Sequence, residues 1–365
     1  MNNKESWSIY CTNELLVLSP ILLRHGYTLE ADQPHVSGER FLMQAITTTG
    51  GKKLILIGTS RTGTRVIIKA TRDFSGKEEI VHEHVCRDIL EKINFAGSVF
   101  HSPEELLYID ELEFRIVVTR YIEQTSAFLD RRLEDQYLFA LQAFKEQESA
   151  HATTYTHKKL IANTFGIRTA DTYKKICTSF VHNLEHVLPS EKEIISQLKA
   201  AESLIMKEHM TIEQYCGFLT HTDFVPHNIR ITQNTIYLLD HSSLVFGNKY
   251  DGWARFVNFM TLHNPPLERA LVAYIRENRT PEELVSLRMM RLFRLGEIIW
   301  YYAQTLEKSA GDLLTLNTAR MHFWNNILTH ILQDIEIPQS LIAEYIVTRD
   351  ALRSDEEKVR QKGLH

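Results

Sequence analysis

The chain has 365 residues, enough for two lobes with separate hydrophobic cores. Hydrophobic residues make up 44% and charged residues 24%, as in ordinary globular proteins, and the net charge of −5 argues against a nucleic-acid partner. The four cysteines show no Cys-x-x-Cys spacing, so we expect reduced thiols in a cytoplasmic protein.

The most apolar N-terminal stretch, residues 15–23, is too short to span a bilayer and contains Pro20. It has no signal-peptide cleavage pattern, and no other apolar run approaches the length of a membrane span. We therefore expect no contact with a membrane.

Three apolar segments then predict a small β-sheet. Residues 41–47 and 53–58 are strand candidates joined by a Thr- and Gly-rich turn, and residues 65–70 form a third strand with one lysine, Lys69. Backbone N–H groups of such a turn can hold an anion, although the turn lacks the Gly-x-Gly-x-x-Gly pattern. Taken alone, Lys69 would be an ordinary solvated charge at a strand edge.

Residues 77–93 predict an amphipathic helix, because their apolar positions recur near a 3.6-residue period. Glu83 borders the apolar face, and Glu79, one turn earlier, is the alternative for a buried role; surface glutamates mostly face water. Residues 114–123 read as a strand that runs into polar sequence, where we place the boundary between the two lobes.

Helical patterns dominate the rest of the chain. The sequences Ser190-Glu-Lys-Glu and Thr280-Pro-Glu-Glu have the spacing of capping boxes and predict two helix starts. The second of these helices should end near Lys308, and further helices should cover about 312–334 and the residues after Pro338.

The strongest functional signal is the segment His221-Thr-Asp-Phe-Val-Pro-His-Asn228. Its spacing, His-x-Asp-x-x-x-x-Asn, is that of a phosphotransferase catalytic loop. An apolar hairpin pattern over 229–239 follows, and a hairpin brings its two ends together. Asn228 and Asp240 would then lie side by side and could share one or two Mg²⁺ ions, which prefer oxygen ligands. A turn or helix-cap role would suit each residue alone but not the whole set.

The order of these elements resembles the protein-kinase-like superfamily, and more closely the aminoglycoside phosphotransferase and choline kinase group. The catalytic segment is similar to the His-Gly-Asp-Phe-x-Pro-x-Asn of bacterial members, and the resemblance covers about residues 41–260. It implies an α+β fold of two lobes, with a small antiparallel β N-lobe and a large, mainly helical C-lobe. We expect the N-lobe over 1–122, the C-lobe over 123–350 and a polar tail over 351–365.

The resemblance also implies roles for single residues. Lys69, oriented by Glu83, would hold the nucleotide phosphates, and Asn228 and Asp240 would bind Mg²⁺. Asp223 would orient the acceptor hydroxyl and take its proton, whereas a bracing role by hydrogen bonds is expected for the histidine that opens the motif.

Two further nucleotide contacts are implied by position alone. The turn between the first two strands would cover the phosphates through Thr48, Thr49 and Gly50. The C=O of Arg120 and the N–H of Ile122 would bind adenine at the hinge between the lobes.

The implied activity is ATP-dependent transfer of the γ-phosphate to a hydroxyl of a small molecule, such as an aminoglycoside, an amino alcohol or a sugar-like compound. Val225 stands where protein kinases commonly have Lys, and no Ala-Pro-Glu sequence follows Asp240, so a protein acceptor is not expected. The late helices show no sign of the acidic groove that a polycationic aminoglycoside would favour. Aromatic residues there belong either to the core or to the acceptor site: Trp253, Phe256, Trp300, Tyr301 and Tyr302.

Two departures from the family pattern leave an alternative open. Thr222 replaces the usual Gly, which restricts the backbone, and His241-Ser242 follows Asp240 where the family has an aromatic residue. Together with the Gly-poor turn, the change at Thr222 keeps a second hypothesis: a kinase-fold pseudoenzyme that acts as a nucleotide-binding regulatory partner.

Overall fold

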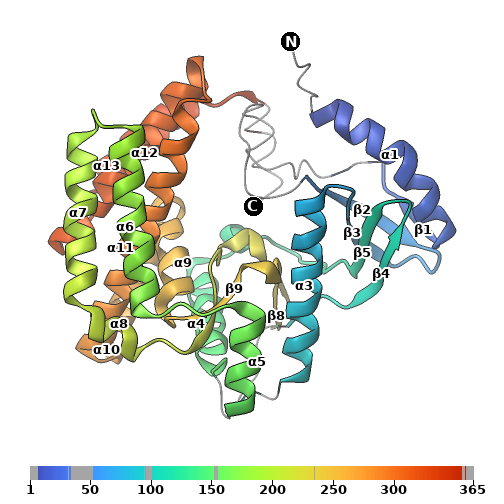
Figure 1. The fold of residues 1–365 in the computed structure, drawn as a ribbon, viewed down its shortest axis with the longest axis horizontal. Helices are drawn as coiled ribbons and strands as arrows, with labels where there is room; N and C mark the ends of the chain where they lie inside the picture. Colours follow the sequence, from blue (N-terminus) through green and yellow to red (C-terminus); the bar gives the residue numbers. More distant parts are fainter. Residues whose placement is uncertain are drawn as a thin grey trace.

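The computed structural model describes residues 7–31, 33, 52–93, 95, 101–151, 155–233, 235–355 and 358. It has two lobes: a small lobe built on an antiparallel sheet, and a larger lobe that is mainly helical (Figure 1). In Figure 1 the sheet lies at the right and the helices at the left, with helix α3 (Phe74–Lys92) standing between them. The two-lobed α+β architecture expected from the sequence is therefore confirmed.

The small lobe holds a five-stranded antiparallel sheet in the order β1-β2-β3-β5-β4. Its strands are β1 (Tyr27–Leu29), β2 (Leu54–Ser60), β3 (Arg65–Thr71), β4 (Glu105–Glu111) and β5 (Phe114–Arg120). Side chains of β2 and β3 alternate in burial, as expected for a sheet with one face on a core. The predicted strands over 53–58 and 65–70 are thus present, and the segment predicted over 114–123 is a strand as far as Arg120; the predicted strand over 41–47 lies outside the described residues.

The apolar N-terminal stretch forms part of helix α1 (Trp7–Arg24), which covers this sheet. Leu18, Ile21 and Leu22 are fully buried and join side chains of β2, β3 and β5 in one hydrophobic core. Within the described part of the chain, no helix is long and apolar enough to cross a membrane.

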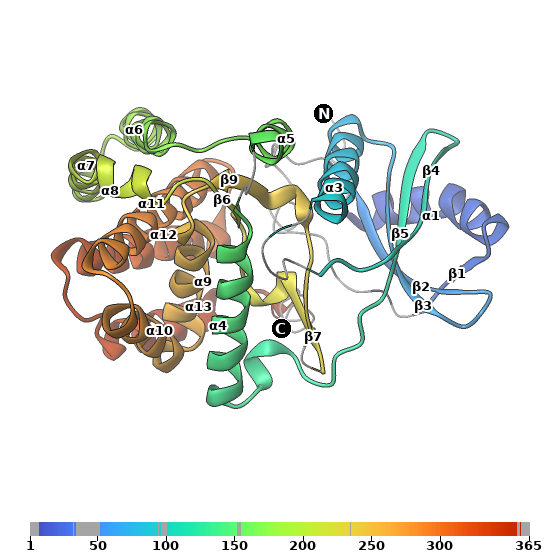
Figure 2. The same cartoon turned by 90° about the horizontal axis from the view of Figure 1, so that it is seen from below.

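Helix α3 lies between the sheet and the larger lobe (Figure 2). It begins three residues earlier than the sequence pattern predicts, because the Asp73 side chain accepts a hydrogen bond of 3.0 Å from the Gly76 N–H and caps the helix. Its buried face includes Ile80, Glu83 and Cys86, so a carboxylate is placed inside the structure.

The large lobe packs ten helices of the described chain around one core. They are α4 (Leu133–Ser149), α5 (Tyr155–Phe165), α6 (Ala170–Val187), α7 (Lys192–Lys207), α8 (His209–Gln214), α9 (Tyr250–His263), α10 (Pro265–Asn278), α11 (Pro281–Leu306), α12 (Gly311–Gln333) and α13 (Gln339–Leu352).

The two predicted capping boxes have different outcomes. At the start of α11, Thr280 accepts from the Glu283 N–H and Glu283 accepts from the Thr280 N–H, which is a complete capping box. The box predicted at Ser190 is wrong. Helix α7 begins at Lys192, and a turn in which the Glu191 N–H bonds the Leu188 C=O leaves Ser190 outside the cap position.

Two small antiparallel ladders hold the segment 221–228. Strand β6 (Phe218–His221) precedes it and pairs with β9 (Leu244–Gly247). Strand β7 (Ile229–Thr232) follows it and pairs with β8 (Thr235–Leu238), which is the predicted hairpin. The segment is therefore fixed by backbone hydrogen bonds at both ends.

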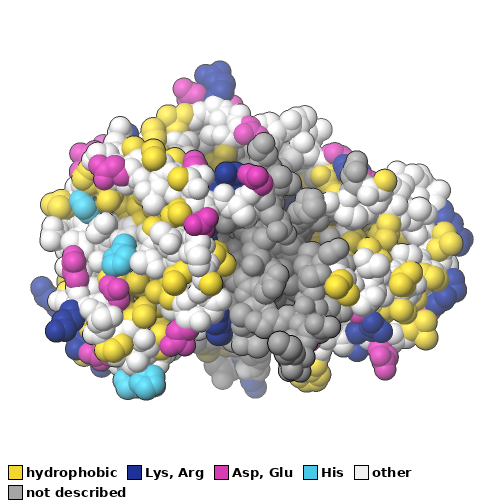
Figure 3. Space-filling view, turned by 90° about the horizontal axis from the view of Figure 1, so that it is seen from above, with side chains coloured by type: hydrophobic (Ala, Val, Ile, Leu, Met, Phe, Trp, Pro, Cys, Tyr) yellow, Lys and Arg dark blue, Asp and Glu magenta, His cyan; other side chains and the backbone are white. Residues whose placement is uncertain are grey.

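The outer surface has no single dominant charge on the face shown in Figure 3. Acidic and basic side chains are interspersed over the described part of the helical lobe. This agrees with the near balance of 41 Lys and Arg against 46 Asp and Glu in the sequence.

Candidate active site

The strand lysine and a helix glutamate form a buried ion pair. The Lys69 Nζ lies 2.8 Å and 2.6 Å from the two carboxylate oxygens of Glu83. Glu83 is only 5% exposed and is also bonded by Arg87, at 3.3 Å. The alternative, Glu79, pairs instead with Lys53 at 2.6 Å. The structure therefore brings together the two residues that the sequence predicts.

Neighbouring positive charges keep Glu83 ionised. Burial works to raise the pKa of Glu83, and Asp240 adds to that effect, but Lys69 and Arg87 together hold the pKa below its ordinary value. Lys69 is also the strongest charge that lowers the pKa of Asp240. One ammonium group thus stabilises two carboxylates, one from α3 and one from the end of the β7–β8 hairpin.

The hairpin closes as predicted and brings its ends together. Ile229 pairs with Leu238, and the Leu239 N–H donates to the Asn228 C=O at 2.8 Å. Asn228 therefore faces Leu239, the residue directly before Asp240. Its side-chain NH₂ donates to the Asp223 C=O at 2.8 Å and to the Asp223 carboxylate at 3.0 Å, so the amide oxygen is the atom suited to a metal.

Asp240 is a strongly acidic carboxylate. Its backbone adopts the left-handed conformation (φ 56°, ψ 59°), which Asp tolerates better than most residues. Its carboxylate accepts hydrogen bonds from the Ser242 hydroxyl (2.6 Å) and the Ser243 hydroxyl (3.0 Å). Burial opposes ionisation, yet Lys69, with His221 and the Ser242 hydrogen bond, holds the pKa of Asp240 well below its usual range.

These two residues suit Mg²⁺. Among the described residues, no group of three or more His, Cys, Asp or Glu side chains could hold a metal ion. Mg²⁺ in phosphotransferases does not require such a group, because one or two protein oxygens act together with substrate phosphates and waters. An ionised Asp240 and the Asn228 amide oxygen provide that donor set.

The departures from the family pattern are accommodated. Thr222 is not among the described residues with positive φ, and both its N–H and its hydroxyl donate to the Ser243 C=O, at 2.8 Å and 2.9 Å. His241 is buried and its Nε2 lies 2.8 Å from the Ser102 hydroxyl. Burial lowers the pKa of His241 to about 3, so the ring is neutral.

His221 braces the loop, as the sequence suggests. It is fully buried, and its Nε2 lies 3.1 Å from the Leu239 C=O and 3.0 Å from the Asp240 C=O. These contacts connect the end of β6 to the end of the hairpin.

Asp223 stands where the segment 221–228 meets a large cavity of about 590 Å³. Its carboxylate is 39% exposed and forms an ion pair with Arg255, whose Nε and Nη2 lie at 3.0 Å and 2.9 Å. Burial would raise the pKa of Asp223, but Arg255, with His227 and His221, holds it below its ordinary value. The carboxylate is therefore ionised at neutral pH.

The cavity contains residues that the sequence patterns did not identify. Arg255, Arg294, Arg320, Arg349 and Arg353 all line it. The sequence offered one signal: Arg294 stands between Phe293 and Leu295 in α11, and the structure buries it to 1% exposure.

The five late aromatic residues divide between core and cavity. Tyr301 and Tyr302 line the cavity. Trp253 and Phe256 are buried in the core of the large lobe, and Trp300 packs against that core.

The predicted hinge residues lie at the end of β5. Arg120 is the last residue of that strand, and its guanidinium pairs with Glu104 at 2.6 Å. The next N–H, that of Tyr121, donates to the Arg65 C=O, and Ile122 follows it toward the helical lobe. Their role toward adenine stays a prediction, and Thr48, Thr49 and Gly50 lie outside the described residues.

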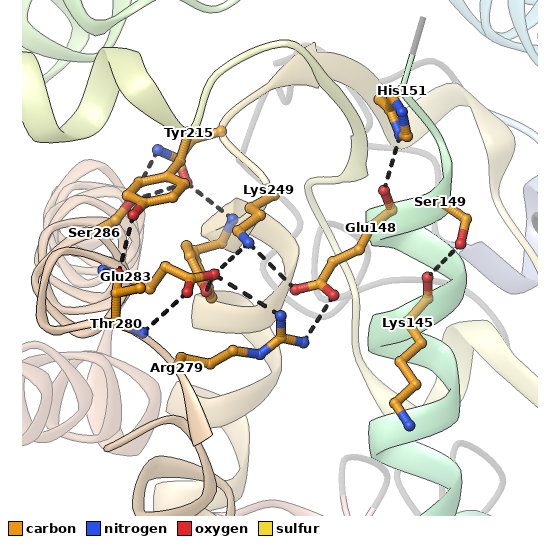
Figure 4. Close-up of polar contacts among 12 residues, drawn as sticks. Lys145, Glu148, Ser149, His151, Tyr215, Lys249, Arg279, Thr280, Glu283 and Ser286 are labelled. Atoms are coloured by element: carbon orange, nitrogen blue, oxygen red, sulfur yellow. Dashed lines mark hydrogen bonds and ion pairs between the residues drawn. The ribbon is translucent and has the colours of Figure 1, made fainter. Parts of the chain in front are cut away.

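A polar network links α4, α9 and α11 inside the large lobe (Figure 4). Lys249, between β9 and α9, lies 2.5 Å from Glu283 of α11 and 3.5 Å from Glu148 of α4. Arg279 bonds Glu148 at 2.9 Å, and the Tyr250 hydroxyl donates to Glu283 at 2.7 Å. Although burial opposes it, hydrogen bonds from Lys249, Tyr250 and the helix N-terminus lower the pKa of Glu283 to about 2.

The arrangement of two lobes, buried Lys–Glu pair and loop-hairpin unit defines a protein-kinase-like fold. No family model and no curated protein matches the chain by sequence. Among the solved structures that are similar to it in fold are the following three. Aminoglycoside 2'-phosphotransferase-IIIa in its GDP complex has 12% sequence identity and a TM-score of 0.57, over 89% of this chain and 99% of its own. Macrolide 2'-phosphotransferase type I has 13% identity and a TM-score of 0.56, over 85% of this chain and 97% of its own. A thermostable mutant of aminoglycoside phosphotransferase APH(4)-Ia, in a ternary complex with AMP-PNP and hygromycin B, has 15% identity and a TM-score of 0.50, over 82% of this chain and 98% of its own. At these identities the similarity establishes the fold, which is that of small-molecule phosphotransferases.

Proposed function

We propose that the protein is an ATP- and Mg²⁺-dependent phosphotransferase, which transfers the γ-phosphate to a hydroxyl of a small molecule. The observation that carries this proposal is the position of Asp223. Its ionised carboxylate is bonded to Asn228 on one side and lines a cavity large enough for a small molecule on the other. The solved structures of similar fold, with their GDP and AMP-PNP complexes, support a nucleotide as the phosphate donor.

Each predicted residue then has one task. Lys69, held by Glu83, compensates charge on the nucleotide phosphates. Asn228 and Asp240 hold Mg²⁺, which when bound neutralises charge on those phosphates. The Thr48, Thr49 and Gly50 turn, and the Arg120 and Ile122 backbone, remain proposed contacts to the phosphates and the adenine.

In the transfer step the acceptor oxygen bonds to the γ-phosphorus while the bond from that phosphorus to its bridging oxygen breaks. ADP leaves with the electron pair, and the proton of the acceptor hydroxyl passes to Asp223. Because phosphoryl transfer has a loose transition state, orientation of the hydroxyl matters more than the basicity of the carboxylate. The depressed pKa of Asp223 suits that orienting role, since the carboxylate is always available to accept a hydrogen bond.

The Asp223→Asn variant tests this assignment. We expect nucleotide affinity to stay within a few-fold of wild type, while kcat falls by roughly two to four orders of magnitude, the usual contribution of a positioned acid or base. Measurements are nucleotide binding by calorimetry and turnover, or slow ATP hydrolysis, by ADP release. Asp171→Asn, at an exposed position, is the control.

A pseudoenzyme would give another result: Mg·ATP binding without transfer to any acceptor, and hydrolysis unaffected by Asp223→Asn. One argument for that alternative was that Thr222 restricts the backbone where the family has Gly. Thr222 is not among the described residues with positive φ, so this argument is weaker. The proposal fails if the pseudoenzyme pattern is observed.

A further inference from the structure

Arg255 differs from the other arginines that line the cavity, because it touches the carboxylate of Asp223. Its Nε and Nη2 lie 3.0 Å and 2.9 Å from one and the same oxygen, Oδ1. The other oxygen, Oδ2, accepts a hydrogen bond of 3.0 Å from the side chain of Asn228. The carboxylate is therefore held at both oxygens, from α9 on one side and from its own segment on the other.

The contact between Arg255 and Asp223 is one of three adjacent contacts between α9 and the chain around Asp223. The three pairs are Thr220 with Gly252, Asp223 with Arg255, and Phe224 with Phe256. In the first pair the helix N–H donates to the hydroxyl at 2.9 Å, and in the third the ring centroids are 5.6 Å apart. Because residues i, i+3 and i+4 share one face of a helix, a single face of α9 makes all three contacts.

The packing of α9 fixes the backbone that carries Arg255. Its neighbours in the chain, Ala254 and Phe256, are fully buried. A Cβ on Gly252 would lie 2.9 Å from the His221 C=O, closer than such atoms approach in real proteins, so this distance between helix and segment requires glycine. The guanidinium of Arg255 thus extends from a support whose position relative to the segment 221–228 is determined.

The carboxylate of an aspartate needs such a support. Rotation about its last torsion is broad, and Asp223 is 39% exposed, so water can compete for its oxygens. Without Arg255, the Asn228 amide is the only described group that still bonds this carboxylate. A group that orients a hydroxyl for transfer tolerates little displacement, since a shift of about 1 Å can cost about 10² in rate.

We propose that Arg255 is a positioning residue of the phosphoryl transfer, which fixes the carboxylate of Asp223 toward the acceptor hydroxyl and acts on the reaction only through Asp223. This inference rests on the proposed function. An ionised carboxylate offers about four lone-pair sites. The contacts with Arg255 and Asn228 leave room for the hydroxyl to bond as well.

A double-mutant cycle on Asp223 and Arg255 tests the inference. The probe is Mg·ATP with water as the acceptor, followed by ADP release. We expect Arg255→Met to lower kcat by about 10–10², with KM for ATP within a few-fold of wild type, because the misplaced group faces the acceptor. Asp223→Asn should lower kcat further, and adding Arg255→Met to Asp223→Asn should cause no further loss, since the two residues act as one unit.

Two further variants control for charge and for folding. Arg255→Lys keeps the charge but loses the planar fork, so it should recover only part of the kcat that Arg255→Met loses. If Arg255→Met does not fold, Arg255→Lys replaces it in the cycle, with a several-fold loss expected only while Asp223 is intact. Arg115→Met is the matched control and should leave kcat unchanged. Arg115 is 21% exposed, against 24% for Arg255, and its Nε bonds the Asp110 carboxylate at 2.8 Å in the small lobe.

The outcomes separate this inference from the proposed function. A low kcat in Asp223→Asn with a wild-type kcat in Arg255→Met supports the phosphotransferase and overturns the positioning role. The same fold-loss from Arg255→Met with and without the Asp223 carboxylate also overturns it, because Arg255 would then act independently. A larger loss in Arg255→Met than in Asp223→Asn would reverse the two roles and has the same consequence. Hydrolysis that Asp223→Asn leaves unchanged contradicts the phosphotransferase and the inference together.

Discussion

The two halves of the candidate site are built in different ways. The nucleotide half takes its side chains from a strand, one helix and a loop-hairpin unit, and its charges are locally paired: Lys69 stabilises both Glu83 and Asp240. The proposed acceptor half takes its side chains from helices far apart in the chain, α9 and α11 to α13, and five arginines line it. In the proposed function, the first half would hold the nucleotide and the second would hold the acceptor.

This contrast suggests where a change will stop the chemistry and where it will alter selectivity. Changes in the nucleotide half should act on turnover with every acceptor. Changes in the cavity beside Asp223, apart from those at Arg255, should act on the choice of acceptor. Changes in the polar network around Lys249 and Glu283 should act on stability.

The largest effect is expected for Asp240→Ala. The substitution removes the carboxylate that, with Asn228, is proposed to hold Mg²⁺, so turnover should be abolished with every acceptor. Circular dichroism and thermal denaturation should show a folded protein, because the lost carboxylate is bonded to two serine hydroxyls, and the backbone C=O that meets His221 is kept. Turnover like that of wild type would remove Asp240 from the metal site.

The next effect is expected for Lys69→Ala, which should lower kcat by about 10²–10³, the usual cost of losing one preorganised charge at a reacting group. Glu83→Gln should lower kcat less, because Glu83 acts through Lys69. The matched control is Glu79→Gln on the same helix, which pairs with Lys53 and should be close to silent. A damaging Glu79→Gln with a silent Glu83→Gln would contradict the observed pairing. Steady-state kinetics with one acceptor at saturating ATP suffices.

The smallest effect on chemistry, but a clear one on stability, is expected for Glu283→Gln. Breaking the buried pair with Lys249 should lower the free energy of unfolding by about 3–5 kcal/mol while KM changes little. Because the pKa of Glu283 is lowered from 4.5 to about 2, its contribution in wild type is complete above pH 4.5 and is lost as pH falls toward 2.

Urea unfolding at pH 7 and pH 3 measures both parts of this prediction. The difference between wild type and Glu283→Gln should be large at pH 7 and smaller at pH 3. A difference that is the same at both values would show that the charge of Glu283 does not stabilise the fold. Glu282→Gln, at the neighbouring exposed position on α11, is the control.

Much of the nucleotide half could be predicted from the sequence because its signals are local. The order of residues in His221 to Asn228, and the apolar hairpin after it, determine where Asp223, Asn228 and Asp240 lie relative to one another, since a hairpin of fixed register brings its ends together. The choice of Glu83 over Glu79 followed from its position on the apolar face of an amphipathic helix. A prediction that failed elsewhere, the cap at Ser190 before α7, was also a local one, in which a competing turn took the predicted residue.

The acceptor half was decided by the tertiary structure alone. Arg255, Arg294, Arg320 and Arg349 stand on four different helices, and no spacing in the chain relates them. Helix periodicity tells which face of each helix is apolar, but it does not tell which polar residues at the edges of those faces will meet once the helices pack. The sequence by itself thus predicted which residues would hold phosphate and metal and placed them near one another, whereas only the packing of α9, α11, α12 and α13 brought together the side chains of the cavity beside Asp223.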